Sequence, residues 1–396
     1  GTGDTAELVS SSLTFRECLI SGMSTCSGME RFGFTPHLIS IFLWSIFKDI
    51  NATISAWSFL NFVLYCIIIY YFFSQIRNNK FIKLSILIFS PIPAYAVYSY
   101  SEMSYIFLIF VVILSLKKNN YLISSLLAIL LSAYKETSIL LIFPIIFAGL
   151  FYENLKFNLR KILVLSSSFL GFLFVYLFNY YKYGQFINNE YQTAGRVTEP
   201  NLLLSNFFGI WFSPTGGIIG VFWFSIVVFL FIHFKQNFNS KNLILNNLIL
   251  LFTIFINWIM LTFWFSPFGW VTWGPRLFMP TLFACFIFIL IFYQQQILEF
   301  NVFSRILIAI GSFLSILNVL GFLKNSESFK IWLESVIYFS PNCPKLFVWE
   351  IERIQYIKCF TSMTWELNSL NLITIKSYFM SVLEFNLNSI ILILIL

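Results

Sequence analysis

The sequence predicts an all-α integral membrane protein, a polytopic bundle of about 9–11 transmembrane helices. Its 396 residues are 59% hydrophobic and 10% charged, and the mean hydropathy is +0.83. A soluble domain carries about a quarter charged residues, because its surface must face water. Apolar runs recur along the chain, and clusters of positive residues separate them. Together these observations exclude an ordinary soluble protein.

The apolar runs are close to the length of about 20 residues that a helix needs to cross a bilayer. They are 54–75, 81–99, 102–116, 121–134, 138–153, 162–181, 210–234, 243–265, 277–297 and 306–323. Residues 37–50 are expected to form an interfacial or re-entrant helix, or a further short span. The sequence leaves this choice open.

The positive residues predict the orientation, because short cytoplasmic loops are enriched in Lys and Arg. They cluster at four turns: Arg77, Lys80 and Lys83; Lys117 and Lys118; Lys156, Arg160 and Lys161; and Lys235 and Lys241. If these turns are cytoplasmic, residues 1–53, 99–102, 134–137, 182–209 and 266–276 all lie outside.

This topology divides the chain into three parts. Residues 1–53 form a first extracytoplasmic loop with interfacial helices, 54–323 the transmembrane bundle, and 324–396 an extracytoplasmic tail that ends in an apolar stretch at 389–396. The first loop holds Cys18 and Cys26, and the tail holds Cys343 and Cys359. Outside the cytoplasm such pairs can form disulfides, although the sequence does not fix the pairing.

Several function classes are excluded by what the sequence lacks. The net charge of +7 is spread over short clusters between apolar runs, so no nucleic-acid-binding face is predicted. No phosphate-binding Gly-rich loop, HExxH or GxSxG occurs. The two histidines, His37 and His233, fall on opposite membrane faces, which excludes a metal site built from both. Whether a divalent metal assists is left open.

The candidate chemistry lies on the outer face. Charges at membrane depth are costly and face a cavity or a partner, so acids and bases gathered at one depth indicate a site. The expected catalytic residues are Asp4, Glu7 and Glu102, and the expected substrate and lipid-phosphate ligands are Lys135, Glu136, Arg276, His37 and Tyr183.

Each charged candidate also has a structural explanation. Asp4 can cap a helix, and Glu102 can stabilise the N-terminus of its own helix. Lys135 and Glu136 can pair with each other in a solvated turn. Arg276 can anchor a helix at the depth of the headgroups.

Seven segments, in order, resemble the GT-C glycosyltransferases, polytopic enzymes that take a sugar from a polyprenyl-phosphate carrier on the extracytoplasmic side. The segments are GTGDTAELVSSSLTF, FTPHLISIFLWSIF, YSEMSYIFLIF, SAYKETSILLIFPIIF, YYKYGQF, GIWFSPTGGIIGVFWF and GWVTWGPRLFMPTLFA, and they cover roughly residues 1–297. The sequence departs from the family pattern at Thr5, which separates Asp4 from the next acidic residue, and at Lys135, where Arg is commoner. The resemblance also implies that one transmembrane helix is missing before Gly3-Asp4.

The resemblance implies an inverting transfer in which Asp4 takes the proton of an acceptor hydroxyl. Glu7 or Glu102 would orient the acceptor. Arg276 and Lys135 would hold the lipid phosphate, because cations stabilise a leaving phosphate. The expected partners are a lipid-linked sugar donor, membrane lipid, and a glycan, lipid or protein acceptor. The expected location is a bacterial inner membrane with the site facing outward.

Three other classes remain open at this point, one of which is a non-catalytic membrane scaffold. A transporter or flippase of lipid-linked glycans would also be polytopic, but such proteins often carry internal repeats, and no convincing repeat is present. A polymerase or ligase of surface polysaccharide would use similar outer-loop Arg and acidic residues.

Overall fold

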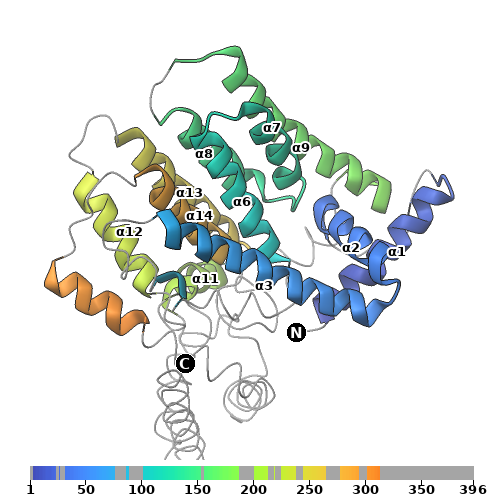
Figure 1. Cartoon of the computed structure of the whole chain (residues 1–396), viewed down its shortest axis with the longest axis horizontal. Helices are drawn as coiled ribbons and strands as arrows, with labels where there is room; N and C mark the ends of the chain where they lie inside the picture. Colours follow the sequence, from blue (N-terminus) through green and yellow to red (C-terminus); the bar gives the residue numbers. More distant parts are fainter. Residues whose placement is uncertain are drawn as a thin grey trace, which may run out of the picture.

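A computed structural model of the chain describes residues 3–23, 26, 32–75, 86–88, 101–152, 156–186, 200–212, 218, 224–237, 244–264, 277–293 and 301–312. Its elements are helices (Figure 1): α1 (Gly3–Ile20), α2 (Phe34–Phe47), α3 (Ile50–Gln75), α6 (Glu102–Lys117), α7 (Tyr121–Ser132), α8 (Ile139–Leu150), α9 (Leu159–Tyr183), α11 (Pro200–Phe212), α12 (Phe224–Asn237), α13 (Ile244–Thr262) and α14 (Met279–Phe292). A further short apolar helix spans Val302–Ser312. The prediction of an all-helical chain is confirmed for these residues.

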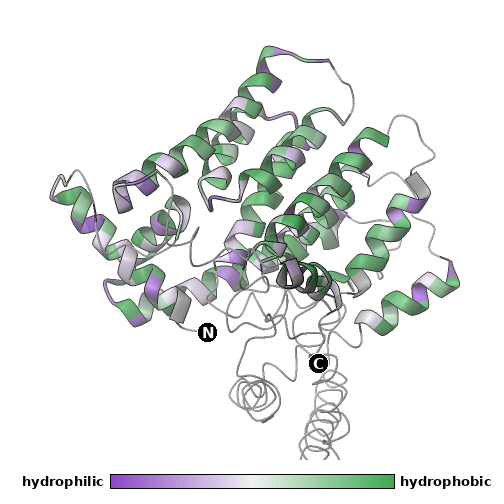
Figure 2. Ribbon diagram, turned by 180° about the vertical axis from the view of Figure 1, so that it is seen from behind, coloured by the Kyte–Doolittle hydropathy of each residue, from purple (hydrophilic) through white to green (hydrophobic). Residues whose placement is uncertain are grey.

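Three of the described helices, α3, α9 and α13, are long and apolar enough to cross a membrane. About a third of each is buried inside the protein, and the other residues are half-buried or exposed. Figure 2 shows that hydrophobic residues occupy most of the length of the helices. Apolar surface that faces both inward and outward is expected where lipid replaces water as the solvent. The predicted total of about 9–11 spans stays a prediction, and the predicted span 81–99 lies outside the described residues except for 86–88.

The centre of the bundle is formed by α6 and α14. Every residue of α14 is buried, and α6 packs against α14, α3, α7 and α8. A helix that is hydrophobic on all sides has to be surrounded by other elements or by lipid, and here other helices surround α14. Away from this centre, α1 and α2 both lie beside one end of α9 (Figure 1).

The closest helix contact joins α7 and α9. A Cβ atom added to Gly171 would lie 2.4 Å from the carbonyl oxygen of Ile129 and 2.9 Å from Cβ of Ser132. Ala128, Ser132 and Ser168 on the same interface are fully buried. Small residues let two helix backbones approach in a lipid environment, where packing drives association. This contact sets the position of α9 relative to the turn that follows α7.

One predicted span is wrong. The apolar run 210–234 was expected to form a single helix, but α11 ends at Phe212 and α12 begins at Phe224. The Ile218 amide donates to the Ile210 carbonyl oxygen at 2.9 Å, a contact that a continuous helix could not make. The intervening sequence contains SPTGG. Proline removes a helical hydrogen bond and glycine has a low helix propensity, so the hydropathy continues across a point where the helix does not.

Gly171→Val is expected to destabilise the protein by about 1–3 kcal/mol or more, because the new side chain has to separate α7 from α9. The midpoint of thermal unfolding in detergent measures this effect. Ser166→Val on the exposed side of α9 is the matched control, because it adds similar bulk where no helix packs. Equal loss of stability in both variants would contradict the close contact.

Candidate functional site

The candidate site is built around the turn of residues 133–138, which joins α7 to α8. Tyr134 is fully buried, and its hydroxyl donates a hydrogen bond to the Ser101 carbonyl oxygen at 2.5 Å and lies 2.7 Å from Ser104 Oγ. The Lys135 amide donates to Ser138 Oγ at 3.0 Å, which closes the turn. The turn is therefore fixed to the first residues of α6, and it presents Lys135 and Glu136 at its tip.

Lys135 forms an ion pair with Glu102. Its Nζ atom lies 3.1 Å from Glu102 Oε1, and the side chains are 31% and 4% exposed respectively. Glu102 stands in the first turn of α6, where the helix dipole favours a carboxylate. The sequence singled out both residues, and the structure brings them together. The ammonium group keeps hydrogens directed away from Glu102, so it can still bind an anion.

Glu136 contacts a different helix, α9. Its Oε1 atom accepts a hydrogen bond of 2.5 Å from Asn179 Nδ2 on α9, and Asn179 itself is buried. The simple alternative, in which Lys135 and Glu136 bind one another, is not the observed arrangement. Lys135 reaches α6 and Glu136 reaches α9, so the turn connects two helices that are distant in sequence.

The segment before α2 lies against the same turn. A Cβ atom on Gly33 would fall 2.1 Å from the Tyr134 carbonyl oxygen, so only glycine allows the two backbones to approach this closely. Thr35 Oγ1 donates to the Leu130 carbonyl oxygen at 2.6 Å. These contacts bring the predicted first loop to the charged turn.

His37 is buried at the junction of α1, α2 and α9. Ser12 Oγ donates to the Leu8 carbonyl oxygen at 2.5 Å, so at 2.8 Å it accepts from His37 Nδ1. This assigns the ring proton to Nδ1 and leaves a lone pair on Nε2, which has no hydrogen-bond partner among the described residues. The rings of Phe15 and Phe178 surround the imidazole.

Burial lowers the pKa of His37 from 6.5 to about 3, and the charge of Lys182 contributes in the same direction. The Phe32 carbonyl group opposes the shift, although it does not reach Nε2 in hydrogen-bond geometry. His37 is therefore neutral at physiological pH. It can accept a hydrogen bond, and it cannot supply a positive charge to a phosphate.

Lys182 is a buried cation that the sequence reasoning missed. Its Nζ atom donates to the Phe32 carbonyl oxygen at 2.9 Å and lies 4.6 Å from the centre of the Tyr183 ring. Tyr183, a predicted ligand, thus contacts a cation at the end of α9. The signal was present in the segment YYKYGQF, where a lysine in the last turn precedes Gly184, the left-handed helix stop.

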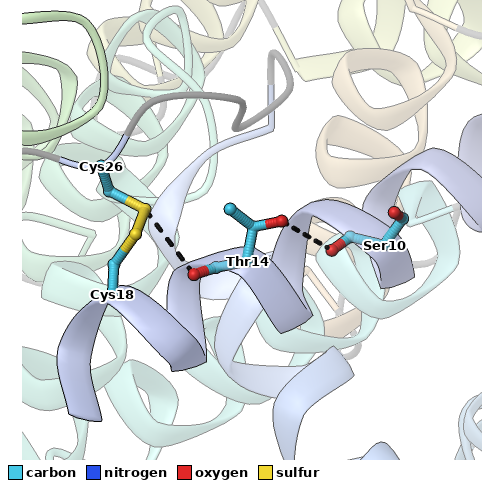
Figure 3. The surroundings of a disulfide bond; sticks show 4 residues. All are labelled: Ser10, Thr14, Cys18 and Cys26. Carbon is cyan, nitrogen blue, oxygen red and sulfur yellow. Dashed lines mark hydrogen bonds between the residues drawn. A yellow bond between two sulfur atoms is a disulfide. The ribbon is translucent and has the colours of Figure 1, made fainter. Parts of the chain in front are cut away.

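A disulfide between Cys18 and Cys26 closes the loop after α1 (Figure 3). The Cys26 amide donates to the Tyr181 carbonyl oxygen at 2.8 Å, which attaches this loop to α9. The Cys26 sulfur also lies 3.7 Å from the Thr14 carbonyl oxygen, a contact rather than a donated bond because a disulfide sulfur carries no hydrogen. The local pairing in the first loop is thus observed, whereas Cys343 and Cys359 lie outside the described residues.

The remaining predicted residues are only partly described. α1 begins at Gly3, so Asp4 and Glu7 stand three residues apart on one helical side, and Glu7 is exposed. The side chain of Asp4 and the whole of Arg276 lie outside the described part of the chain. A cavity shared by Asp4, Glu102, Lys135 and Arg276 therefore stays a prediction.

No group of three or more His, Cys, Asp and Glu side chains suited to a metal ion occurs among the described residues. Comparison with protein-family models, curated proteins and solved structures finds no match for this chain.

Lys135→Met is expected to lower stability by roughly 1–3 kcal/mol, because it leaves the buried Glu102 carboxylate without its cation; the partial exposure of Lys135 keeps the loss below that of a fully buried pair. Adding Glu102→Gln should recover most of the loss. Unfolding midpoints of both single variants and the double variant measure the coupling. Strictly additive effects would contradict the ion pair.

His37 is expected to make the folded state sensitive to acid. The pKa of His37 is about 3 in the folded state, against an ordinary value of 6.5. The contribution of the neutral imidazole to the free energy of unfolding is therefore fully present above pH 6.5. It falls by about 1.4 kcal/mol per pH unit as the pH drops from 6.5 towards 3, because only the unfolded chain then binds the proton. Unfolding midpoints at about pH 7.5, above this window, and at about pH 5.5 and 4.5, inside it, should diverge between the wild type and His37→Gln as the pH falls. Parallel pH profiles would rule out a buried neutral imidazole.

Proposed function

We propose that this protein is a membrane glycosyltransferase of the GT-C type, which moves a sugar from a polyprenyl-phosphate carrier to an acceptor hydroxyl on the extracytoplasmic face. The observation that supports this most is the buried Glu102–Lys135 pair, on a turn to which the first loop and the end of α9 are both attached. Glu102, Lys135 and the C-terminal end of α9 therefore lie at the same end of the bundle.

Two independent features support the outward orientation of this end. The Cys18–Cys26 disulfide requires an oxidising compartment, so the first loop and the C-terminal end of α9 belong outside the cytoplasm. The positive clusters at Lys117–Lys118 and Lys156–Lys161 lie at the ends of α6 and α9 that are farthest from the candidate site. The positive-inside rule expects such clusters on the cytoplasmic side. A bacterial inner membrane provides both compartments.

In the proposed reaction Asp4 accepts the proton of the acceptor hydroxyl as its oxygen bonds to the anomeric carbon. The bond from that carbon to the phosphate oxygen breaks at the same time, and polyprenyl phosphate leaves with the electron pair. A general base contributes about 10²–10⁴-fold to such a step. Attack opposite the leaving group inverts the anomeric carbon.

The leaving phosphate gains negative charge as the bond breaks, so cations nearby stabilise the transition state. Lys135 is suited to this role because Glu102 fixes one of its hydrogens while 31% of the side chain stays exposed. Arg276 would add a bidentate fork, and Glu7 would orient the acceptor. His37 is neutral and fully buried, so it supplies no charge to the phosphate.

Asp4→Asn is expected to reduce sugar transfer by about 10²–10⁴-fold, because the amide cannot take the acceptor proton. The assay follows transfer from a radiolabelled polyprenyl-phosphate sugar in membranes that contain equal amounts of each variant. Glu17→Gln, which removes an exposed carboxylate from the same helix, is the matched control and should leave transfer unchanged. A transporter or flippase would move lipid-linked glycan equally well after the Asp4→Asn substitution, and that result would refute the transferase.

A further inference from the structure

α9 is longer than the hydrocarbon core of a membrane is thick. The helix has 25 residues, so at about 1.5 Å per residue it is about 37 Å long, against a hydrocarbon thickness of about 30 Å. Arg160 and Lys161 mark its cytoplasmic end. Tyr180 lies 19 residues, about 28 Å, from Lys161, so in the proposed orientation it stands at the outer edge of the hydrocarbon core, next to the headgroups.

Two aromatic rings are stacked at this end. The rings of Tyr180 and Phe186 are 4.8 Å apart with an interplanar angle of 24°, and the two residues are 47% and 53% exposed. Gly184 makes the stack possible, because its φ of +67° reverses the chain and returns Phe186 to the helix. The pair is thus a preformed, half-open aromatic surface.

A carboxylate stands beside this aromatic surface. Asn179 Nδ2 donates to Glu136 Oε1 at 2.5 Å and to the Phe186 carbonyl oxygen at 3.5 Å, so one buried amide positions both the acid and the ring-bearing segment. Tyr176, one turn earlier on α9, lies within electrostatic reach of Glu136. Glu136 itself is exposed and keeps acceptor capacity for a ligand.

We propose that Tyr180, Phe186 and Glu136 form a binding surface for a neutral saccharide. The apolar C–H face of a sugar ring packs on an aromatic ring, and sugar hydroxyls donate to a carboxylate, so this combination matches both sides of the ligand. Exposed aromatic residues at this depth also anchor proteins in the headgroup region. A headgroup anchor does not require a positioned carboxylate acceptor beside the rings, so the presence of Glu136 favours the saccharide.

This inference rests on the proposed transferase function and narrows its acceptor to a glycan. Glu136, one of the three residues of this surface, is next to Lys135 in the turn. A bound saccharide would therefore lie beside the cation proposed to hold the donor phosphate. The acceptor would bind on the α9 side of the turn and the donor on the α6 side.

The test measures saccharide binding directly, without donor. The full chain is placed in phosphatidylcholine nanodiscs and titrated with fluorescently labelled maltoheptaose, cellohexaose, chitopentaose and mannopentaose. At least one should bind, and Tyr180→Leu with Phe186→Leu should weaken it by at least about fivefold, because leucine keeps apolar area but lacks a flat ring face. Glu136→Gln should weaken binding as well.

The control is Tyr70→Leu with Phe73→Leu, which alters an exposed Tyr and Phe pair near the end of α3 and should leave saccharide binding unchanged. Failure of all four probes to bind, or equal binding by the Tyr180/Phe186 variant, would overturn the proposal. So would a variant that loses only its membrane insertion, since that marks a headgroup anchor. The Asp4→Asn variant should still bind the saccharide. Loss of transfer therefore tests the proposed transferase, and loss of saccharide binding tests the proposed binding surface.

Discussion

The ion pair between Lys135 and Glu102 is the interaction on which the arrangement of this end of the protein depends. The Glu102 carboxylate is buried, and a buried charge is tolerated only with a partner. The pairing fixes the turn between α7 and α8 to the start of α6. Gly33 can then approach the Tyr134 carbonyl group, and Asn179 can reach Glu136. The ion pair acts together with the hydrogen bonds of Tyr134 and the α7–α9 packing at Gly171, which also hold the turn and α9 in place.

The sequence predicted the helices well where hydropathy and helix propensity agree. α3, α9 and α13 coincide with apolar runs. The charged turn falls between the predicted runs 121–134 and 138–153, as expected. The prediction failed at 210–234, where apolar composition continues through SPTGG although the bond from Ile218 to Ile210 shows that the helix does not. Hydropathy reports the solvent that a segment prefers, and it does not report where a helix ends.

The candidate site was predictable in its residue types but not in its pairings. Lys135 and Glu102 are 33 residues apart, and Glu136 and Asn179 are 43 apart. The second separation becomes a contact through the close α7–α9 packing at Gly171, and neither composition nor spacing encodes that packing directly. Lys182 was overlooked for a related reason. A lysine near a helix end is usually solvated, and here the Phe32 carbonyl and two aromatic rings enclose it.

The enclosure of Lys182 bears on how the site handles charge. Lys182 and Lys135 are two cations at the same end of the bundle, and the neutral His37 lies within electrostatic reach of Lys182 without adding a third. A protonated imidazole there would repel Lys182 and loosen the segment from Phe32 to Gly33 that covers the turn. Keeping His37 uncharged therefore preserves the covering loop.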